Sequence, residues 1–99
     1  MRVLEAAVKR EVKRQLKALE AYQHWPVMQG FGAVTLDRIA CVGGRYMAIE
    51  TKAFPGKKPT PLQLATIKSI RDSGGIALVI SSVDEAKCLP ELLAHERAI

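Results

Sequence analysis

The sequence has few of the residues that build disulfide frameworks or zinc sites. Its two cysteines, Cys41 and Cys88, are too far apart for a paired zinc motif and too few for a small secreted scaffold. We therefore expect both to be free thiols. The two histidines, His24 and His95, are isolated from each other and from the cysteines, so we expect structural or surface roles for them.

Long apolar runs are also lacking. None approaches the ~20 residues that a membrane-spanning helix needs, and the N-terminal segment becomes charged at once, unlike a secretory signal. The sequence has no repeats, linkers or low-complexity stretches either. We expect a single domain over residues 1–99, located in the cytoplasm.

Acidic residues are outnumbered by basic ones. Ten Asp and Glu stand against fifteen Lys and Arg, which gives a formal net charge of +5. A hydrophobic content of 48% with 25% charged residues is typical of a folded globular domain. The balance of charge favours a polyanionic partner, either a nucleic acid or an anionic membrane surface.

Residues 3–19 have the apolar spacing of an amphipathic helix with a basic back. Glu5 is an exception, because at about 100° per residue it falls within roughly 40° of the centre of the apolar stripe. The basic back is a candidate for phosphate contact, with Lys9 and Lys13 as its chosen members; it comprises Lys9, Arg10, Lys13, Arg14 and Lys17.

The rest of the chain alternates between strand and helix patterns. We expect a short strand within residues 23–33, a hairpin of strands 36–42 and 45–51 around Gly43-Gly44, and a helix over 61–73 opened by Thr60-Pro61. A strand over 76–80 and a final helix after Ser82 follow, and Pro90 should break or restart that helix. This order predicts an α/β fold, a small mixed sheet flanked by helices.

The hairpin carries the charged residues of greatest interest. If Val42 pairs with Arg45, the register places Asp37 opposite Glu50, and strand alternation puts Lys52 on the same face. Two opposed carboxylates repel each other, and a divalent cation such as Mg²⁺ would relieve that repulsion. Lys52 would then orient a water molecule or stabilise charge on a phosphate, and the carbonyl of Thr51 could also face the metal.

Three stretches of the sequence resemble a known nuclease family. Residues 32–39, 48–53 and 57–63 read GAVTLDRI, AIETKA and KKPTPLQ. They resemble the VRR-NUC branch of the PD-(D/E)XK nucleases, and the likeness covers nearly the whole chain. It departs at Leu36, where the family usually has proline before the aspartate, which puts the local geometry in doubt more than the activity.

The resemblance implies a restriction-endonuclease-like αβββαβ core and a Mg²⁺ or Mn²⁺ site. It implies that Asp37, Glu50 and Glu5 are metal ligands. It also implies that Lys52 is the catalytic lysine and Gln63 a supporting polar residue. Gln63 is explained equally well as the third helical residue of a capping box begun by Thr60.

The function that we predict is metal-dependent, structure-specific cleavage of DNA. Small VRR-NUC proteins, common in phages and bacteria, are similar in plan to Holliday-junction resolvases, so we expect branched DNA as the partner. Symmetric junction cleavage requires a homodimer. Lys57 and Lys58 are expected to contact DNA from a loop after Lys52, and the candidate interface residues are Leu89, Leu92, Leu93 and Ile99.

Other functions stay open at this point, because an E-x-K pattern alone is common and Asp37 could form an ordinary salt bridge with Arg38 or Lys52. One alternative is a nuclease directed at flaps, nicks or single strands. Another is a non-catalytic DNA-binding module with the same fold. A membrane-surface protein is a third alternative, and it depends on the first helix alone.

Overall fold

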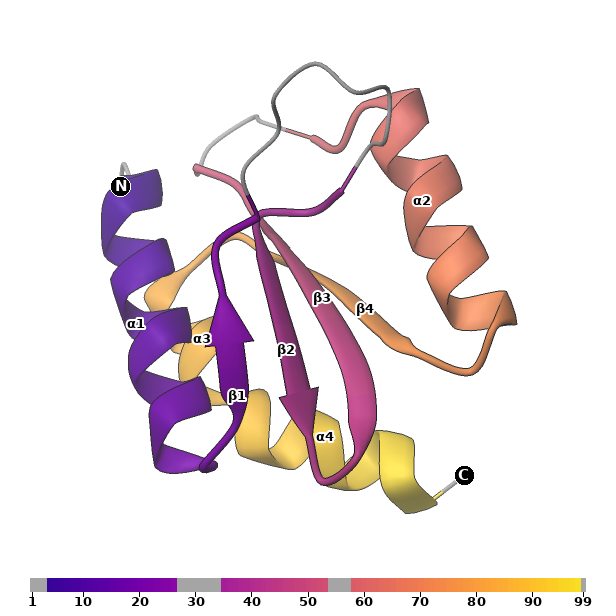
Figure 1. Ribbon diagram of the computed structural model, residues 1–99. Coiled ribbons are helices and arrows are strands. Elements are labelled where there is room, and N and C mark those ends of the chain that lie inside the picture. The colour runs from indigo at the N-terminus through magenta and orange to yellow at the C-terminus, as the bar shows by residue number, and fades with distance from the viewer. Residues whose placement is uncertain (1–3, 27–34, 54–57, 99) are drawn as a thin grey trace.

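The computed structural model describes residues 4–26, 35–53 and 58–98, and it confirms the predicted α/β class (Figure 1). The predicted order of helices and strands is also confirmed. The elements are α1 (Glu5–Ala18), β1 (Tyr22–His24), β2 (Arg38–Val42), β3 (Arg45–Thr51), α2 (Pro61–Asp72), β4 (Ile76–Ile80), α3 (Val83–Lys87) and α4 (Leu89–Ala98).

The sheet is mixed and follows the chain order β1-β2-β3-β4. The first two pairings are antiparallel, and β3 pairs with β4 in parallel. Gly43 and Gly44 have φ angles of 58° and 81°, a conformation that glycine adopts without steric cost. The two-residue turn sets the predicted register, so Val42 pairs with Arg45 and Arg38 pairs with Ile49.

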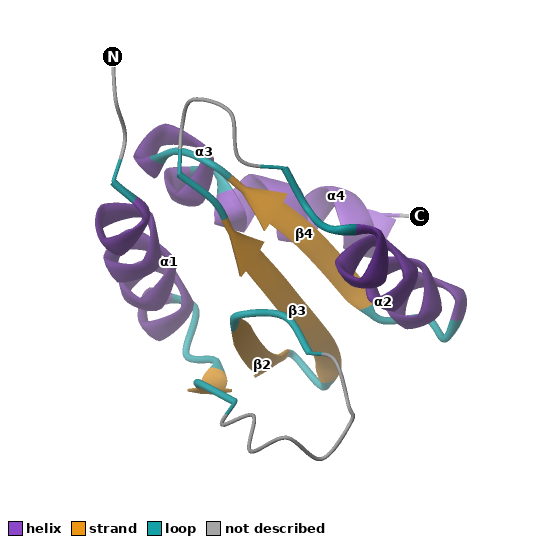
Figure 2. Cartoon of the chain, turned by 90° about the horizontal axis from the view of Figure 1, so that it is seen from above, coloured by secondary structure: helices purple, strands orange, loops and turns teal. Residues whose placement is uncertain are grey.

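Helices cover both faces of the sheet. On one face, α1, α3 and α4 bury apolar residues of alternate strand positions, such as Met47 and Ile49. On the other face, Ile67 of α2 packs with Ala48 and Ala77. Figure 2 shows α1 and α2 on opposite sides of the strands β2, β3 and β4. With both faces covered, the central strand β3 is buried from Met47 to Thr51.

The last helical segment is interrupted, as Pro90 predicts. The chain leaves the helix at Cys88 and resumes it at Leu89, so Pro90 lies in the first turn of α4, where no backbone donor is lost. The proposed interface role of two leucines here is wrong: Leu89 and Leu93 are in the core. Leu92 is 37% exposed, and Ile99 lies outside the described residues.

The apolar side of α1 is used inside the protein. Val8, Val12 and Leu16 are buried against the sheet and the C-terminal helices. Within the described ranges, no helix has the length and apolar character to cross a membrane. The membrane-surface alternative therefore loses its main support, because the apolar stripe on which it depended is already covered.

Replacing Leu16 with alanine should lower the free energy of unfolding by about 2–5 kcal/mol, since the side chain is fully buried and would leave a cavity. Urea denaturation monitored by circular dichroism measures the loss. Leu64→Ala is the matched control, because Leu64 is 53% exposed, and its effect should stay within about 0.5 kcal/mol. Equal losses in the two variants would contradict the packing of α1 described above.

Candidate active site

The charged residues predicted from the hairpin gather at one end of the sheet. There β3 ends at Thr51, β2 is about to begin, and α2 starts at Pro61 (Figure 1). The backbone N–H of Lys52 still donates to the carbonyl of Ile80 at 3.0 Å, which ties this end of β3 to β4. The position of the site is thus determined by the end of the buried central strand β3 and by the N-terminal end of α2.

We predicted that Asp37 would lie in the strand ladder, opposite Glu50. In the structure Asp37 lies one residue before β2, outside the ladder. Its Oδ2 atom accepts two hydrogen bonds from Thr51, one from the backbone N–H and one from the hydroxyl, each at 2.9 Å. The chain bends at Asp37 because the carboxylate satisfies the last residue of β3 in place of a ladder partner. Its side chain is therefore held by Thr51, and its charge contributes to the raised pKa of Glu50.

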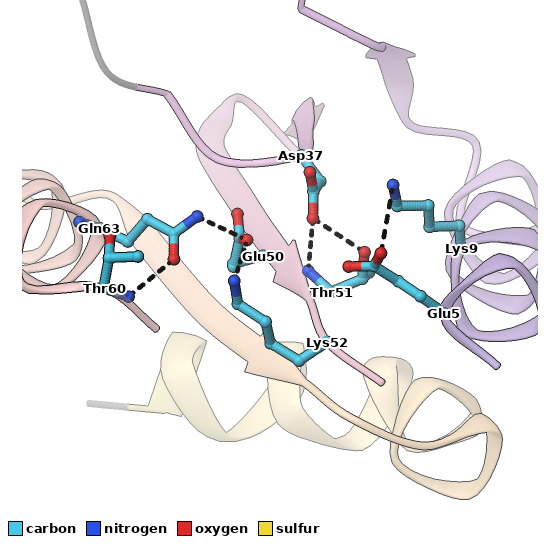
Figure 3. A network of polar contacts seen from close by, with 8 residues as sticks. All are labelled: Glu5, Lys9, Asp37, Glu50, Thr51, Lys52, Thr60 and Gln63. Carbon is cyan, nitrogen blue, oxygen red and sulfur yellow. Dashed lines mark hydrogen bonds and ion pairs between the residues drawn. The ribbon is translucent and has the colours of Figure 1, made fainter. Parts of the chain in front are cut away.

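Glu50 is a buried carboxylate whose two oxygens have different surroundings (Figure 3). Its exposed fraction is 3%. Oε2 accepts a hydrogen bond from Gln63 Nε2 at 2.8 Å and pairs with Lys52 Nζ at 3.1 Å. Oε1 is buried and has no hydrogen-bond partner among the described residues. Burial, and secondarily the charge of Asp37, raise the pKa of Glu50 above its ordinary value of 4.5, while Lys52 opposes the rise.

Gln63 forms the predicted capping box and also contacts Glu50, so both of its predicted roles are compatible with its position. Its Oε1 accepts from the backbone N–H of Thr60 at 2.9 Å, and the Thr60 hydroxyl accepts from the Gln63 N–H at 3.1 Å, which completes a capping box. Since the amide oxygen is held by the cap, the amide NH₂ group points to Glu50. The helix cap therefore orients the donor that serves the buried carboxylate.

The donor atoms here suit a hard divalent cation. Carboxylate oxygens are the preferred ligands of Mg²⁺, and the unpartnered Oε1 of Glu50 is a buried acceptor beside a second carboxylate, Asp37. Glu5 lies 4.0 Å from Lys9 Nζ, and in Figure 3 its carboxylate is directed toward the Thr51 side of Asp37. Within the described part of the chain, no three His, Cys, Asp or Glu side chains form a group able to hold a metal. Asp37 and Glu50 are thus the two carboxylates at this end of the sheet that could contact a cation.

The predicted DNA-contacting lysines are placed unequally. Lys13 and Lys58 are exposed, and Lys57 lies outside the described residues. Lys9 is partly covered, and its Nζ lies 4.4 Å from the centroid of the Trp25 ring.

Two features of the site escaped the sequence reasoning. The hydroxyl of Thr51 anchors Asp37, whereas we predicted a role only for its carbonyl. A β-branched hydroxyl residue between Glu50 and Lys52 is the signal that could have revealed it. Arg38 was considered as a salt-bridge partner of Asp37, but its guanidinium carbon lies 5.0 Å from the centroid of Trp25. No sequence pattern predicts that contact.

Comparison with solved structures confirms the fold expected from the sequence resemblance. A chain described as a VRR_NUC domain has a TM-score of 0.77 with this one at 24% sequence identity, covering 88% of this chain and 94% of that chain. A likeness at this identity establishes a shared fold. No protein-family model and no curated protein matches the sequence.

Glu50→Gln should stabilise the metal-free protein at neutral pH. Since the folded pKa of Glu50 is raised, protonation stabilises the folded state below the unfolded pKa, and this stabilisation is lost as pH rises through the folded pKa. At pH 7 in EDTA the variant should have the higher free energy of unfolding. The difference should vanish near pH 4, where the wild-type carboxyl is protonated too.

Urea unfolding at the two pH values measures this effect. Glu91→Gln is the control, because Glu91 is exposed and its change should stay within about 0.5 kcal/mol at both pH values. A wild-type protein more stable than Glu50→Gln at pH 7 in EDTA would show that Lys52 and Gln63 fully compensate the buried charge.

Gln63→Glu separates the two roles of Gln63. A glutamate keeps the acceptor for the Thr60 N–H and suits the first turn of a helix, so a pure cap would be unaffected or strengthened. The second carboxylate oxygen, however, would meet Glu50 Oε2 where an amide now donates at 2.8 Å. We expect a loss of about 1–3 kcal/mol at pH 7 in EDTA, as for a buried group left without its donor, and little loss at pH 4. A neutral effect at pH 7 would remove Gln63 from the site.

Proposed function

We propose that this chain is a metal-dependent, structure-specific DNA endonuclease. The observation that carries the proposal is the buried, unpartnered Oε1 of Glu50 beside Asp37 and Lys52. A purely structural pair would leave neither a buried carboxylate oxygen without a donor nor two carboxylates close enough to raise one pKa. The nuclease-type fold supports the same interpretation.

Asp37 and Glu50 would hold the ion, with the Thr51 carbonyl as a further oxygen ligand. Mg²⁺ or Mn²⁺ supplies Lewis-acid polarisation of a phosphodiester and a more acidic water. Thr51 fixes one oxygen of Asp37 through two hydrogen bonds, so that carboxylate is oriented before any ligand arrives. The role predicted for Glu5 remains a prediction. Its carboxylate lies 4.0 Å from Lys9 Nζ.

Lys52 is proposed to act on the phosphate. Its side chain is 14% exposed and that of Glu50 is 4% exposed, so Lys52 is the more accessible member of the ion pair. From there it stabilises negative charge that develops on the phosphoryl oxygens during hydrolysis. Gln63 positions Glu50 by holding Oε2, which leaves Oε1 for the ion.

The substrate is proposed to be branched DNA in the cytoplasm of a bacterial or phage-infected cell. The described elements contribute to a sheet and the helices that cover it, with no separate module for reading base edges, so recognition of DNA shape is favoured. Lys9, Lys13, Lys57 and Lys58 would contact phosphates. Resolution of a four-way junction needs two sites related by a two-fold axis, so we propose a homodimer.

A cleavage panel tests this function. The protein is incubated with labelled four-way junctions, flaps, nicked duplex and linear duplex, in Mg²⁺, Mn²⁺ or EDTA. We expect paired symmetric nicks in the junction, no cutting in EDTA, and at least about 100-fold slower cutting by Glu50→Gln and Lys52→Met, as for loss of a charge-stabilising group.

Lys68→Met is the matched control for Lys52→Met, because Lys68 is an exposed lysine of α2 paired with Asp72. It should cut at the wild-type rate. Preference for flaps, nicks or single strands would replace the junction proposal with the corresponding nuclease. Binding without cutting of any substrate would leave a non-catalytic DNA-binding module.

A further inference from the structure

We propose that Lys9, Trp25 and Arg38 form a phosphate-binding site that holds the DNA strand beside the candidate active site. The three residues come from α1, the segment after β1, and β2, so the fold rather than local sequence brings them together. That the ligand is a DNA phosphate depends on the proposed function. The site itself depends only on the geometry of this cluster, named here the Trp25 cluster.

Two cations share one aromatic ring in the Trp25 cluster. Lys9 Nζ lies 4.4 Å from the ring centroid of Trp25, and the guanidinium carbon of Arg38 lies 5.0 Å from it. Like charges near one ring repel each other, and the π-electrons of the indole attract both cations. The ring therefore preorganises a pair of positive charges, although Trp25 itself is 44% exposed. This exposure does not fit a role in core packing.

The positive charge of the cluster is not matched by nearby carboxylates. Among the described residues, Arg38 forms no ion pair, and the adjacent Asp37 is turned to Thr51. Lys9 meets Glu5 only at 4.0 Å, the outer limit of an ion pair. A partly buried guanidinium without an anion is a costly arrangement, and its planar fork suits the paired oxygens of a phosphate.

The Trp25 cluster has a defined position in the sheet relative to the candidate active site. Arg38 directly follows Asp37, and strand alternation turns its side chain to the face that α1 covers, opposite the face on which Glu50 meets Gln63. Because Asp37 and Arg38 are consecutive residues at the end of the sheet, a DNA strand that passes around this end would have its scissile phosphate at Asp37 and Glu50 and another phosphate at Arg38 and Lys9. The cluster would set the path of the DNA past the end of β3.

DNA binding in EDTA tests the proposal without cleavage. Kd is measured by anisotropy of a labelled junction over a range of salt for wild type, for Lys9→Ala with Arg38→Ala, and for Arg10→Ala with Lys17→Ala. Both double variants lower the net charge from +5 to +3, and Arg10 and Lys17 are exposed residues of the same helix α1. The control pair thus matches the charge but leaves the Trp25 cluster intact.

We expect the cluster variant to bind about 10- to 100-fold more weakly, with a salt slope smaller by about 2, as for the loss of two phosphate contacts. The control pair should change Kd by less than about 3-fold, because solvated charges away from the contact act only over a screened distance. Equal weakening in the two pairs would overturn the proposal, since it would show a diffuse basic surface. Unchanged binding in the cluster variant would overturn it as well.

Trp25→Leu guards against a folding defect in the double variant. It keeps both charges but removes the ring, so Kd should rise about 3- to 10-fold with the salt slope unchanged, as for loss of preorganisation. Trp25 is the only tryptophan of the chain, so its fluorescence in the wild type should shift on binding and report directly on the cluster. A fluorescence signal unaffected by saturating DNA would overturn the site. Binding that behaves as expected in a protein that cuts no DNA would sustain the cluster while refuting the nuclease.

Discussion

The buried carboxylate of Glu50 is the constraint on which the rest of the site depends. A charge at 3% exposure is costly unless its oxygens have partners. Gln63 and Lys52 both serve Oε2, and Oε1 faces none of the described donors. The nearby carboxylate of Asp37 increases the cost, as the raised pKa of Glu50 shows. A cation that binds both acids would remove this cost. The relief of this cost would therefore contribute to the free energy of cation binding.

Much of the fold serves to hold that residue in place. The parallel pairing of β3 with β4 and the helices on both faces keep the end of β3 buried from solvent. The turn at Gly43 and Gly44 sets the register of β2 and β3, and this register places Asp37 beside Glu50. The capping box at Thr60 starts α2 and at the same time directs the Gln63 amide to Glu50. Local elements that stabilise the domain therefore also arrange its chemistry.

The sequence predicted those parts that local rules determine. Glycines suited to positive φ, an N-cap followed by proline, and strand alternation were sufficient for the hairpin register, the start of α2 and the joint placement of Glu50 and Lys52. Tertiary effects decided the rest. Asp37 leaves the ladder because Thr51 offers it two donors. Leu89 and Leu93 are core residues because α4 packs on the sheet. The Trp25 cluster joins three segments that no periodicity connects.

The most direct test of the account is a crystal structure of the protein grown with Mn²⁺, in which anomalous scattering locates the ion. The account predicts one strong peak within coordinating distance of Glu50 Oε1 and of Asp37, with Gln63 and Lys52 still at Glu50 Oε2. Manganese bound elsewhere, together with a Glu50 whose Oε1 has found a protein donor or a plain water, would contradict it.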